Sequence, residues 1–325
     1  MKLDNKNILV LGGAGFVGSH VVSELLKTKI GKISIYDNFS RGKIENIQTS
    51  LEDDRCSIYQ NGGDIRDFDV LNDAMRDMDI VIHLAAMWLL HCKDYPRTAF
   101  NVNIEGTFNV LEACVKNNIQ RLVYSSSASV YGDALEVPMT ENHPFNNRNF
   151  YGATKIAGEA MCRAFHDCYG LDYIGLRYMN VYGPNQDQNA VYSGVIPIML
   201  NKIDSNEQPV INGDGSQAYD FIDVLDVARC NIRAIEAKVT DEFYNVGTGV
   251  QTSIKKLCDS ILEMKSSDLV VKYNPYSEDD ARQMVQNRIG DPKKAENDLD
   301  FKYKYDLKTG LQKLVKWRKE NNFSV

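Results

Sequence analysis

A glycine-rich turn near the start of the chain, GGAGFVG (12–18), is the feature that most restricts the fold. The turn joins an apolar run predicted to be a strand (7–13) to a pattern predicted to be a helix (17–28). Its three regularly spaced glycines allow a tight turn, a close approach of the backbone to a pyrophosphate, and close packing of the helix on the strand. The amino end of that helix would present free N–H groups to phosphate oxygens. The sequence therefore predicts a dinucleotide-binding βα turn.

The alternation of apolar runs and helical patterns continues through the first half of the chain. Strands are predicted at 32–38, 79–86, 120–127 and 172–183, and helices at 70–78, 98–117 and 151–169. Strands that alternate with helices form βαβ units around a parallel sheet, and their right-handed crossovers place helices on both faces. We therefore expect an α/β fold with a Rossmann-type, doubly wound parallel sheet.

This rhythm breaks after about residue 184, where a polar, loop-like stretch begins. A further helix (221–238) and strand (242–249) resemble elements of the main sheet, whereas the C-terminal segment mixes short helices with short strands. We expect an NAD-binding domain from 1–177 plus 221–250, and a smaller, sequence-interleaved α/β substrate-binding part from 178–220 plus 251–325.

The choice of cofactor rests on the residue that ends the second predicted strand. Asp37 lies about twenty residues after the glycine turn, where a carboxylate can bond a ribose diol. A carboxylate here repels the 2′-phosphate of NADP and therefore favours NAD. The positive charge of Arg41 nearby leaves NADP as an alternative. The segment GDIRD (63–67) would place Asp64 and Ile65 near the adenine edge, but Asp64 could instead cap a loop. NAD is therefore the predicted cofactor.

Composition narrows the classes of function. The formal net charge of −7 argues against a general nucleic-acid-binding protein. Seven scattered cysteines without a CxxC pair suit reduced thiols in a cytosol. The N-terminus lacks a signal-peptide pattern, and no apolar stretch reaches the roughly 18 residues of a membrane span. We expect a cytoplasmic protein with no membrane or nucleic-acid partner and no metal site.

Two further motifs carry the groups that redox chemistry at an alcohol needs. YGATK (151–155) spaces Tyr151 and Lys155 by four residues, so both lie on one face of a helix. Loss of hydride from an alcohol requires a base, and a nearby ammonium or a positive nicotinamide ring lowers the pKa of a phenol. We therefore expect the Tyr151 pKa to fall toward the working pH. A serine of YSSSASVYG (124–132), at a strand end, could hold the reacting oxygen.

On these motifs the sequence resembles the extended short-chain dehydrogenase/reductase family, in its nucleotide-sugar epimerase branch. The resemblance covers essentially the whole chain and extends to YDN, GDIRD, VIHLAA, NVNIEGTFNVLEA, RYMNVYGP and GDGSQAYDFIDVLDVA. It implies Ser127 as the catalytic hydroxyl, Tyr151 as the base and Lys155 as its partner. It also implies a homodimer through a four-helix bundle of the helices at 98–117 and 151–169.

The predicted contacts follow from the glycine turn, the strand ends and this resemblance. The residues expected to contact NAD are Gly12, Gly15, Phe16, Val17, Asp37, Asn38, Asp64, Ile65, Leu84, Ala85, Ala86, Asn103, Ser125, Tyr151, Lys155 and Tyr178. The residues expected to contact a nucleotide-diphosphate sugar are Trp88, Ser127, Asn180, Val195, Tyr219 and Arg282. Within these sets, the resemblance places Tyr178 by the nicotinamide and Asn180 on a diphosphate oxygen. Asn103 would support the cofactor site or its nearby backbone.

Two departures from the family pattern concern the substrate. MWLLHC (87–92) replaces a small polar run, and would form either an apolar wall near the sugar or core packing under a loop. Tyr219 stands where the family has an arginine that binds a phosphate. The sequence therefore does not decide whether the usual diphosphate contact is present, or whether the nucleotide is a uridine nucleotide. Arg282 resembles the second phosphate-gripping arginine of the family.

The residues after Ser127 bear on the reaction. Dehydratases of the family carry an Asp-Glu pair directly after the catalytic hydroxyl, and decarboxylases carry a glutamate two residues after it, whereas this chain has Ala128 and Ser129. The resemblance therefore implies an NAD-dependent epimerase acting at C4 through a transient 4-keto sugar, on a UDP-hexose, UDP-uronic acid or UDP-N-acetylhexosamine. Net 4-dehydrogenation, 3- or 5-epimerisation and a non-catalytic NAD-binding protein remain alternatives, and dehydration or decarboxylation is disfavoured.

Overall fold

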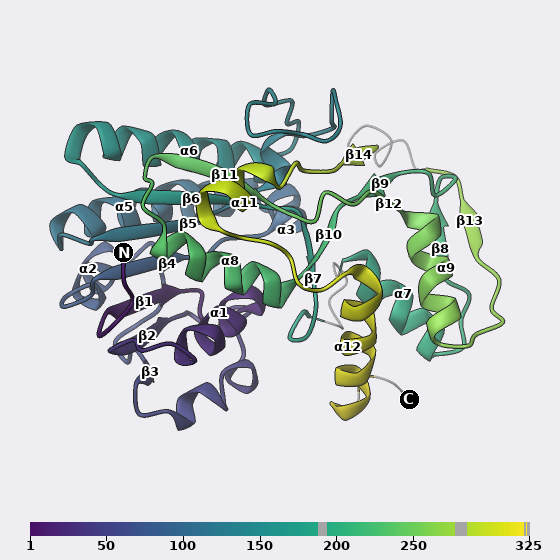
Figure 1. Cartoon of the computed structure of the whole chain (residues 1–325), viewed down its shortest axis with the longest axis horizontal. Helices are drawn as coiled ribbons and strands as arrows, with labels where there is room; N and C mark the ends of the chain where they lie inside the picture. Colours follow the sequence, from purple (N-terminus) through teal and green to yellow (C-terminus); the bar gives the residue numbers. More distant parts are fainter. Residues whose placement is uncertain (188–193, 277–284, 322, 324–325) are drawn as a thin grey trace.

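The computed structural model describes residues 1–187, 194–276, 285–321 and 323, and its centre is a seven-stranded sheet (Figure 1). In spatial order the strands are β3 (Cys56–Ile58), β2 (Lys32–Tyr36), β1 (Asn7–Leu11), β4 (Ile80–His83), β5 (Arg121–Ser127), β6 (Tyr173–Tyr178) and β11 (Glu242–Val246). Every neighbouring pair is parallel. The strand order reverses between β1 and β4, which confirms the predicted Rossmann-type sheet.

Helices cover both faces of this sheet because successive strand side chains point to opposite faces. One face carries α1 (Phe16–Leu26) and α8 (Val224–Glu236), and the other carries α2 (Phe68–Ala74), α5 (Gly106–Lys116) and α6 (Phe150–Tyr169). Ile8 and Val10 of β1 belong to the core under α1 and α8. Leu9 and Leu11 belong to the core under α2, α5 and α6. The sheet is therefore doubly wound.

The helix predicted at 98–117 is interrupted in the structure. It consists of α4 (Pro96–Phe100), a π-helical turn η3 (Asn101–Glu105) and α5, and it follows a short helix, α3 (Leu89–Asp94). A π-helical turn inserts one extra residue into the helical ladder and is frequent at functional sites. Here it contains Asn103, whose contacts are described below.

The strand predicted at 172–183 is also wrong in its second half. It ends at Tyr178, and β7 (Asn180–Tyr182) pairs with β10 (Phe221–Asp223) in a separate two-stranded sheet. The helix predicted to begin at residue 221 begins at Val224, because Asp223 accepts a 2.8 Å hydrogen bond from the Leu225 nitrogen as its N-cap.

The remaining described elements lie mainly beside the sheet, where β6 leads into β7 (Figure 1). They are α7 (Val195–Asp204), β8 (Val210–Asn212), β9 (Ala218–Tyr219), β12 (Thr252–Ser253), α9 (Ile254–Met264), β13 (Lys272–Asn274), β14 (Asn287–Arg288), α11 (Lys293–Leu299) and α12 (Leu307–Glu320). Three short 3-10 turns lie between strands of the main sheet: η1 (Ile44–Asn46), η2 (Ser50–Glu52) and η4 (Ala128–Val130). Residues of α7, α9 and α12 form a third hydrophobic core. Among the helices that the structure describes, none is both long and apolar enough to cross a membrane.

Candidate active site

The glycine turn between β1 and α1 lies against the carboxyl end of β4. Gly12 has a φ of +80°, and a Cβ at this position would lie 2.8 Å from the Ala85 nitrogen. Gly15 caps α1 without a side-chain hydrogen bond, so no side chain covers the N–H groups of Phe16 and Val17 from the cap position. The turn is thus an uncapped helix end with close backbone packing, which fits a dinucleotide pyrophosphate.

Asp37 follows β2 and faces the same turn. Its Oδ2 accepts a hydrogen bond from the Ala14 nitrogen at 2.9 Å, and its Oδ1 accepts one from the Phe39 nitrogen at 2.9 Å. Burial raises the pKa of this carboxyl, and the two N–H donors oppose that effect. Each oxygen keeps a further lone pair, so the donor set fits the diol of an adenosine ribose.

Asp64 and Ile65 lie in the loop between β3 and α2. Asp64 forms a salt bridge of 2.6 Å with Arg66, which lowers the pKa of the carboxyl, and the nearby Asn38 side chain acts in the same direction. Ile65 is buried in the core beneath Gly106 of α5. Asp64 is therefore engaged with its own loop, and contact of either residue with adenine stays a prediction.

Asn103 fixes the segment that follows β4. Its Oδ1 accepts from the Met87 nitrogen at 2.7 Å, and its Nδ2 donates to the Met87 carbonyl at 2.9 Å. The same Nδ2 lies 3.1 Å from the Thr154 hydroxyl of α6. These bonds connect the segment containing Leu84, Ala85 and Ala86 to α6, so Asn103 supports the local backbone.

The three residues predicted to be catalytic come together from β5 and α6. Ser127 is the last residue of β5, and its Oγ accepts from the Ser129 nitrogen at 3.1 Å. α6 begins one residue before Tyr151, because Asn149 accepts a 2.8 Å hydrogen bond as its N-cap. The Ser127 hydroxyl lies close enough to the Tyr151 phenol to act on its pKa in the lowering direction. The structure thus places the hydroxyl predicted to orient substrate beside the phenol predicted to be the base.

Lys155 lies one turn beyond Tyr151 on α6 and is buried. Its Nζ donates to the Ser125 carbonyl at 2.6 Å and lies 5.7 Å from the centroid of the Tyr151 ring. Burial lowers the Lys155 pKa to about 8. Burial also raises the Tyr151 pKa to about 12, against the opposing effects of Ser127 and Arg288. The expected fall of the Tyr151 pKa is therefore not produced by the protein groups alone, because burial outweighs them.

The other serines of the strand end have structural partners. Ser126 donates to Glu159 at 2.5 Å, and Glu159 forms a buried salt bridge of 2.6 Å with Arg177. Ser125 acts on the Tyr178 pKa in the lowering direction, and the Tyr178 hydroxyl donates to Asn231 at 3.0 Å. Sequence reasoning missed this buried network because its members come from β5, α6, β6 and α8.

The residues predicted to bind the sugar nucleotide lie where the main sheet meets the smaller strands. Asn180, in β7, donates its Nδ2 to a backbone carbonyl just before β10 at 3.3 Å. Tyr219, in β9, donates its hydroxyl to the Val285 carbonyl at 2.9 Å. Val195 is the first residue of α7, and the prediction for Arg282 lies outside the described residues. Their contact with substrate stays a prediction.

The apolar segment MWLLHC is divided by the structure. Leu89 to Cys92 belong to α3, which packs on α6, and Cys92 is buried beside Asn103. Trp88 precedes α3, and the Arg41 guanidinium lies 4.5 Å from the centroid of its ring. Trp88 thus joins the segments after β2 and β4, on the edge of the sheet that carries the other candidate residues.

One charged residue near the catalytic groups was missed by sequence reasoning. Arg288, in β14, pairs in register with Tyr219 of β9 and interacts electrostatically with Tyr151. Its strand is too short for an alternating pattern, so nothing local in the sequence marks it.

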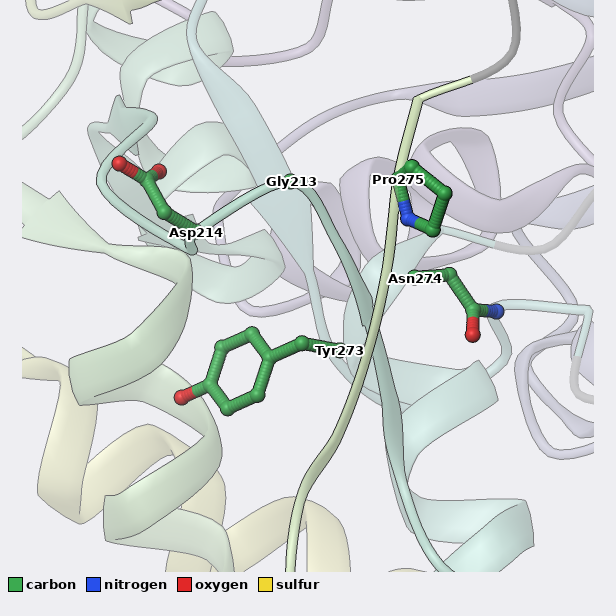
Figure 2. Close-up of a pocket in the computed structure, with 5 residues that line it drawn as sticks. All are labelled: Gly213, Asp214, Tyr273, Asn274 and Pro275. Atoms are coloured by element: carbon green, nitrogen blue, oxygen red, sulfur yellow. The ribbon is translucent and has the colours of Figure 1, made fainter.

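A hollow of about 450 Å³ lies elsewhere, beside β8 and β13 (Figure 2). It is lined by Gly213, Asp214, Tyr273, Asn274 and Pro275. None of these residues belongs to the catalytic or cofactor sets, so we do not assign the reaction to this hollow.

Comparison with known proteins agrees with this geometry. Residues 8–247 match the NAD dependent epimerase/dehydratase family. A protein of Methanocaldococcus jannaschii, provisionally named a UDP-glucose 4-epimerase, is 38% identical over 318 residues, covering 97% of this chain and 99% of the relative. The UDP-N-acetylglucosamine 4-epimerase of Methanobrevibacter ruminantium, in complex with UDP-N-acetylmuramic acid, has a TM-score of 0.91 and 35% identity, covering 98% of this chain and 99% of that chain.

A second solved structure is similar over the same extent. The UDP-glucose 4-epimerase of Thermotoga maritima, with UDP-glucose, has a TM-score of 0.89 and 32% identity, covering 97% of this chain and 99% of that chain. The family match covers most of the chain and includes the glycine turn, Asp37 and the Ser127–Tyr151–Lys155 set. The protein therefore belongs to the NAD dependent epimerase/dehydratase family, an extended branch of the short-chain dehydrogenases/reductases.

Proposed function

We propose that this protein is an NAD-dependent epimerase that inverts C4 of a UDP-sugar. The observation that carries the proposal is the neighbouring Ser127 and Tyr151 side chains, with Lys155 one helical turn away, at the same sheet edge as the glycine turn. Two relatives with solved structures are 4-epimerases of UDP-glucose and UDP-N-acetylglucosamine, which supports a UDP-sugar substrate.

The glycine turn and Asp37 would hold NAD, which would supply reversible hydride transfer at C4 of the sugar. Ser127 would hold the C4 oxygen, because its hydroxyl lies at the strand end beside the phenol. Tyr151 would take the proton of the C4 hydroxyl and return it after the 4-keto sugar has rotated within the site. Lys155, fixed on the Ser125 carbonyl, would supply positive charge near the phenolate. A buried site keeps that charge effective because water does not screen it.

The segment after Ser127 supports epimerisation over the dehydration that other family members perform. Ala128 and Ser129 are buried in η4 and carry no ionisable side chain. Loss of water from C5 and C6 of a keto sugar needs an additional acid and base. With neither at these positions, the transient ketone is expected to be reduced again.

Incubation of the purified protein with NAD and UDP-sugars tests the proposal. Proton NMR should show a new sugar with inverted C4 and no net NADH, for UDP-glucose, UDP-N-acetylglucosamine or UDP-glucuronic acid. Tyr151→Phe should lower turnover by about a hundredfold or more while NAD still binds. Tyr169→Phe, at the exposed far end of the same helix, is the matched control. Accumulated NADH with a keto sugar would instead identify a net dehydrogenase, and unchanged turnover in Tyr151→Phe would overturn the mechanism.

A homodimer in the cytoplasm is part of the proposal. Phe100, Phe108 and Tyr169, on the helices α4 to α6, are 47%, 45% and 64% exposed, and the rings of Phe108 and Tyr169 both contact Phe165, so exposed apolar side chains gather on this face as they do at interfaces. Cys162 and Phe165 pack instead into the core. All seven cysteines are free, as suits a reducing compartment. Sedimentation should give a dimer, and Phe108→Glu should produce monomers; a wild-type monomer would contradict this assignment.

A further inference from the structure

Arg288 occupies a position that is fixed from two sides. Its strand β14 pairs in parallel with β9, with Arg288 in register with Tyr219. The Asp133 carboxylate accepts hydrogen bonds from the Gln286 and Asn287 nitrogens at 2.7 and 3.0 Å. The Arg288 carbonyl in turn accepts from the Asp220 nitrogen at 3.0 Å. The backbone at Arg288 is therefore held by both neighbouring segments.

The guanidinium of Arg288 forms no ion pair with a carboxylate of the described residues, and Asp133 acts on it only at longer range. Its Nε is buried without a hydrogen bond, and no ion pair joins the side chain to a carboxylate in the part of the chain that the structure describes. The fully buried arginines differ: Arg121 pairs with Asp172, Arg177 with Glu159, and Arg318 with Asp204. Arg288 is half-buried, and its Nε has lost water without gaining a hydrogen-bonded acceptor, which is unfavourable.

The surroundings of Arg288 connect the two sides of the candidate site. Its electrostatic neighbours are Tyr219, Asp133 and Tyr151. Of these, Tyr151 is the predicted base on α6, and Tyr219 lies on the strand β9 of the smaller part. Residues in register on neighbouring strands share one face of the sheet, so Arg288 and Tyr219 point to the same side. An anion bound by Arg288 would lie within reach of the reacting sugar.

We propose that Arg288 binds an oxyanion of the nucleotide-sugar substrate and thereby helps to determine which substrate the site accepts. This inference rests on the proposed function. The oxyanion has two sources in UDP-sugars, the diphosphate and a carboxylate carried by the sugar. Both are planar or forked acceptors that a guanidinium binds with two parallel hydrogen bonds, whereas a lysine ammonium binds as a point charge.

The test is calorimetric binding to NAD-loaded protein, so that it does not depend on turnover. The ligands are uridine, UDP, UDP-glucose and UDP-glucuronic acid, and the variants are Arg288→Gln and Arg288→Lys. Arg76→Gln, an exposed arginine on the surface, is the control. If Arg288 holds the diphosphate, Arg288→Gln should weaken UDP and both UDP-sugars by about tenfold or more, with uridine unchanged. If it holds a sugar carboxylate, only UDP-glucuronic acid should weaken. Arg288→Lys should lie between the wild type and Arg288→Gln.

A second variant keeps the proposal testable if Arg288→Gln alone is unstable. The double variant Tyr219→Arg with Arg288→Gln returns a guanidinium to the same face of the sheet from the neighbouring strand. Recovery of at least part of the lost affinity would support an anion site here. Equal affinity of wild type and Arg288→Gln for every ligand, or no binding of any UDP compound by the wild type, would overturn the proposal. Binding that depends on Arg288 without any epimerisation would refute the proposed function and leave this inference standing.

Discussion

The Nζ of Lys155 lies 2.6 Å from the carbonyl oxygen of Ser125, so the carboxyl end of β5 and the first turns of α6 are tied together in the interior. This bond fixes the ammonium about one helical turn from Tyr151, whose ring centroid is 5.7 Å away. Because burial raises the Tyr151 pKa to about 12, the chain alone leaves the phenol protonated at neutral pH. Activation of the base therefore requires positive charge beyond what these side chains supply.

This reasoning predicts the ionisation of Tyr151 in protein stripped of nucleotide. The difference in absorbance near 295 nm between wild type and Tyr151→Phe should stay flat up to about pH 10.5, because a phenol with a pKa of about 12 is then only about 3% ionised. A blocked tyrosine in solution, with its pKa of about 10, is the reference. Addition of NAD should move the difference signal to lower pH. A signal that develops below about pH 9 without NAD would contradict the effect of burial.

Asp37 should determine both the affinity for NAD and its preference over NADP. In Asp37→Asn the side-chain amide cannot accept from both the Ala14 and Phe39 nitrogens, and the charge that repels a 2′-phosphate is lost. We expect NAD to bind about ten- to a hundredfold more weakly, with a smaller preference over NADP. Fluorescence titration with NADH and NADPH measures both effects.

Asp64→Asn is the matched control for Asp37, because the Asp64 carboxylate is already bonded to Arg66. It should change the affinity for NADH by less than about threefold, as expected for a partly exposed ion pair. Equal losses in the two variants would show that Asp64 contacts the cofactor, as the sequence had left open.

Alanine substitutions at two glycines of the same turn should affect different properties, one the free energy of unfolding and the other the affinity for NAD. A Cβ on Gly18 would lie 2.1 Å from the Gly12 carbonyl oxygen, so Gly18→Ala should lower the free energy of unfolding by about 2 kcal/mol or more. A Cβ on Gly15 would lie 3.2 Å from that oxygen, and its φ of −75° suits alanine. Gly15→Ala should therefore fold with nearly normal stability and still bind NAD more weakly, because its methyl group enters the path of the pyrophosphate. Urea unfolding and NADH titration of both variants check this division, and normal NADH binding by Gly15→Ala would contradict it.

The sequence predicted those parts of the site that depend on position relative to a strand end. Gly12, Asp37 and Ser127 lie at the ends of β1, β2 and β5, and short-range spacing brings Tyr151 and Lys155 together on α6. The parts that it could not predict depend on contacts between distant segments.

Arg288 and the strand β7 show the limit of such prediction. Arg288 acquires its position only because β14 pairs with β9. Likewise, β7 leaves the main sheet because it pairs with β10. No local pattern between residues 172 and 183 predicts this pairing. The tyrosine at position 219 was recognisable as a departure from the family, but its neighbour across the strands was not.

Glu159 provides the last prediction, because it is one turn beyond Lys155 and bears no predicted catalytic role. Its carboxylate accepts from Ser126 and pairs with Arg177, and both partners of this salt bridge are nearly fully buried. Glu159→Gln would leave the Arg177 guanidinium buried without a counter-charge, so we expect a loss of about 3–5 kcal/mol in the free energy of unfolding. Glu112→Gln, which breaks an exposed pair with Lys116 on α5, should lose less than about 0.5 kcal/mol. Urea unfolding measures both variants, and similar losses would mean that Tyr131 and the Glu141 carbonyl, which also bond Arg177, suffice to satisfy its charge.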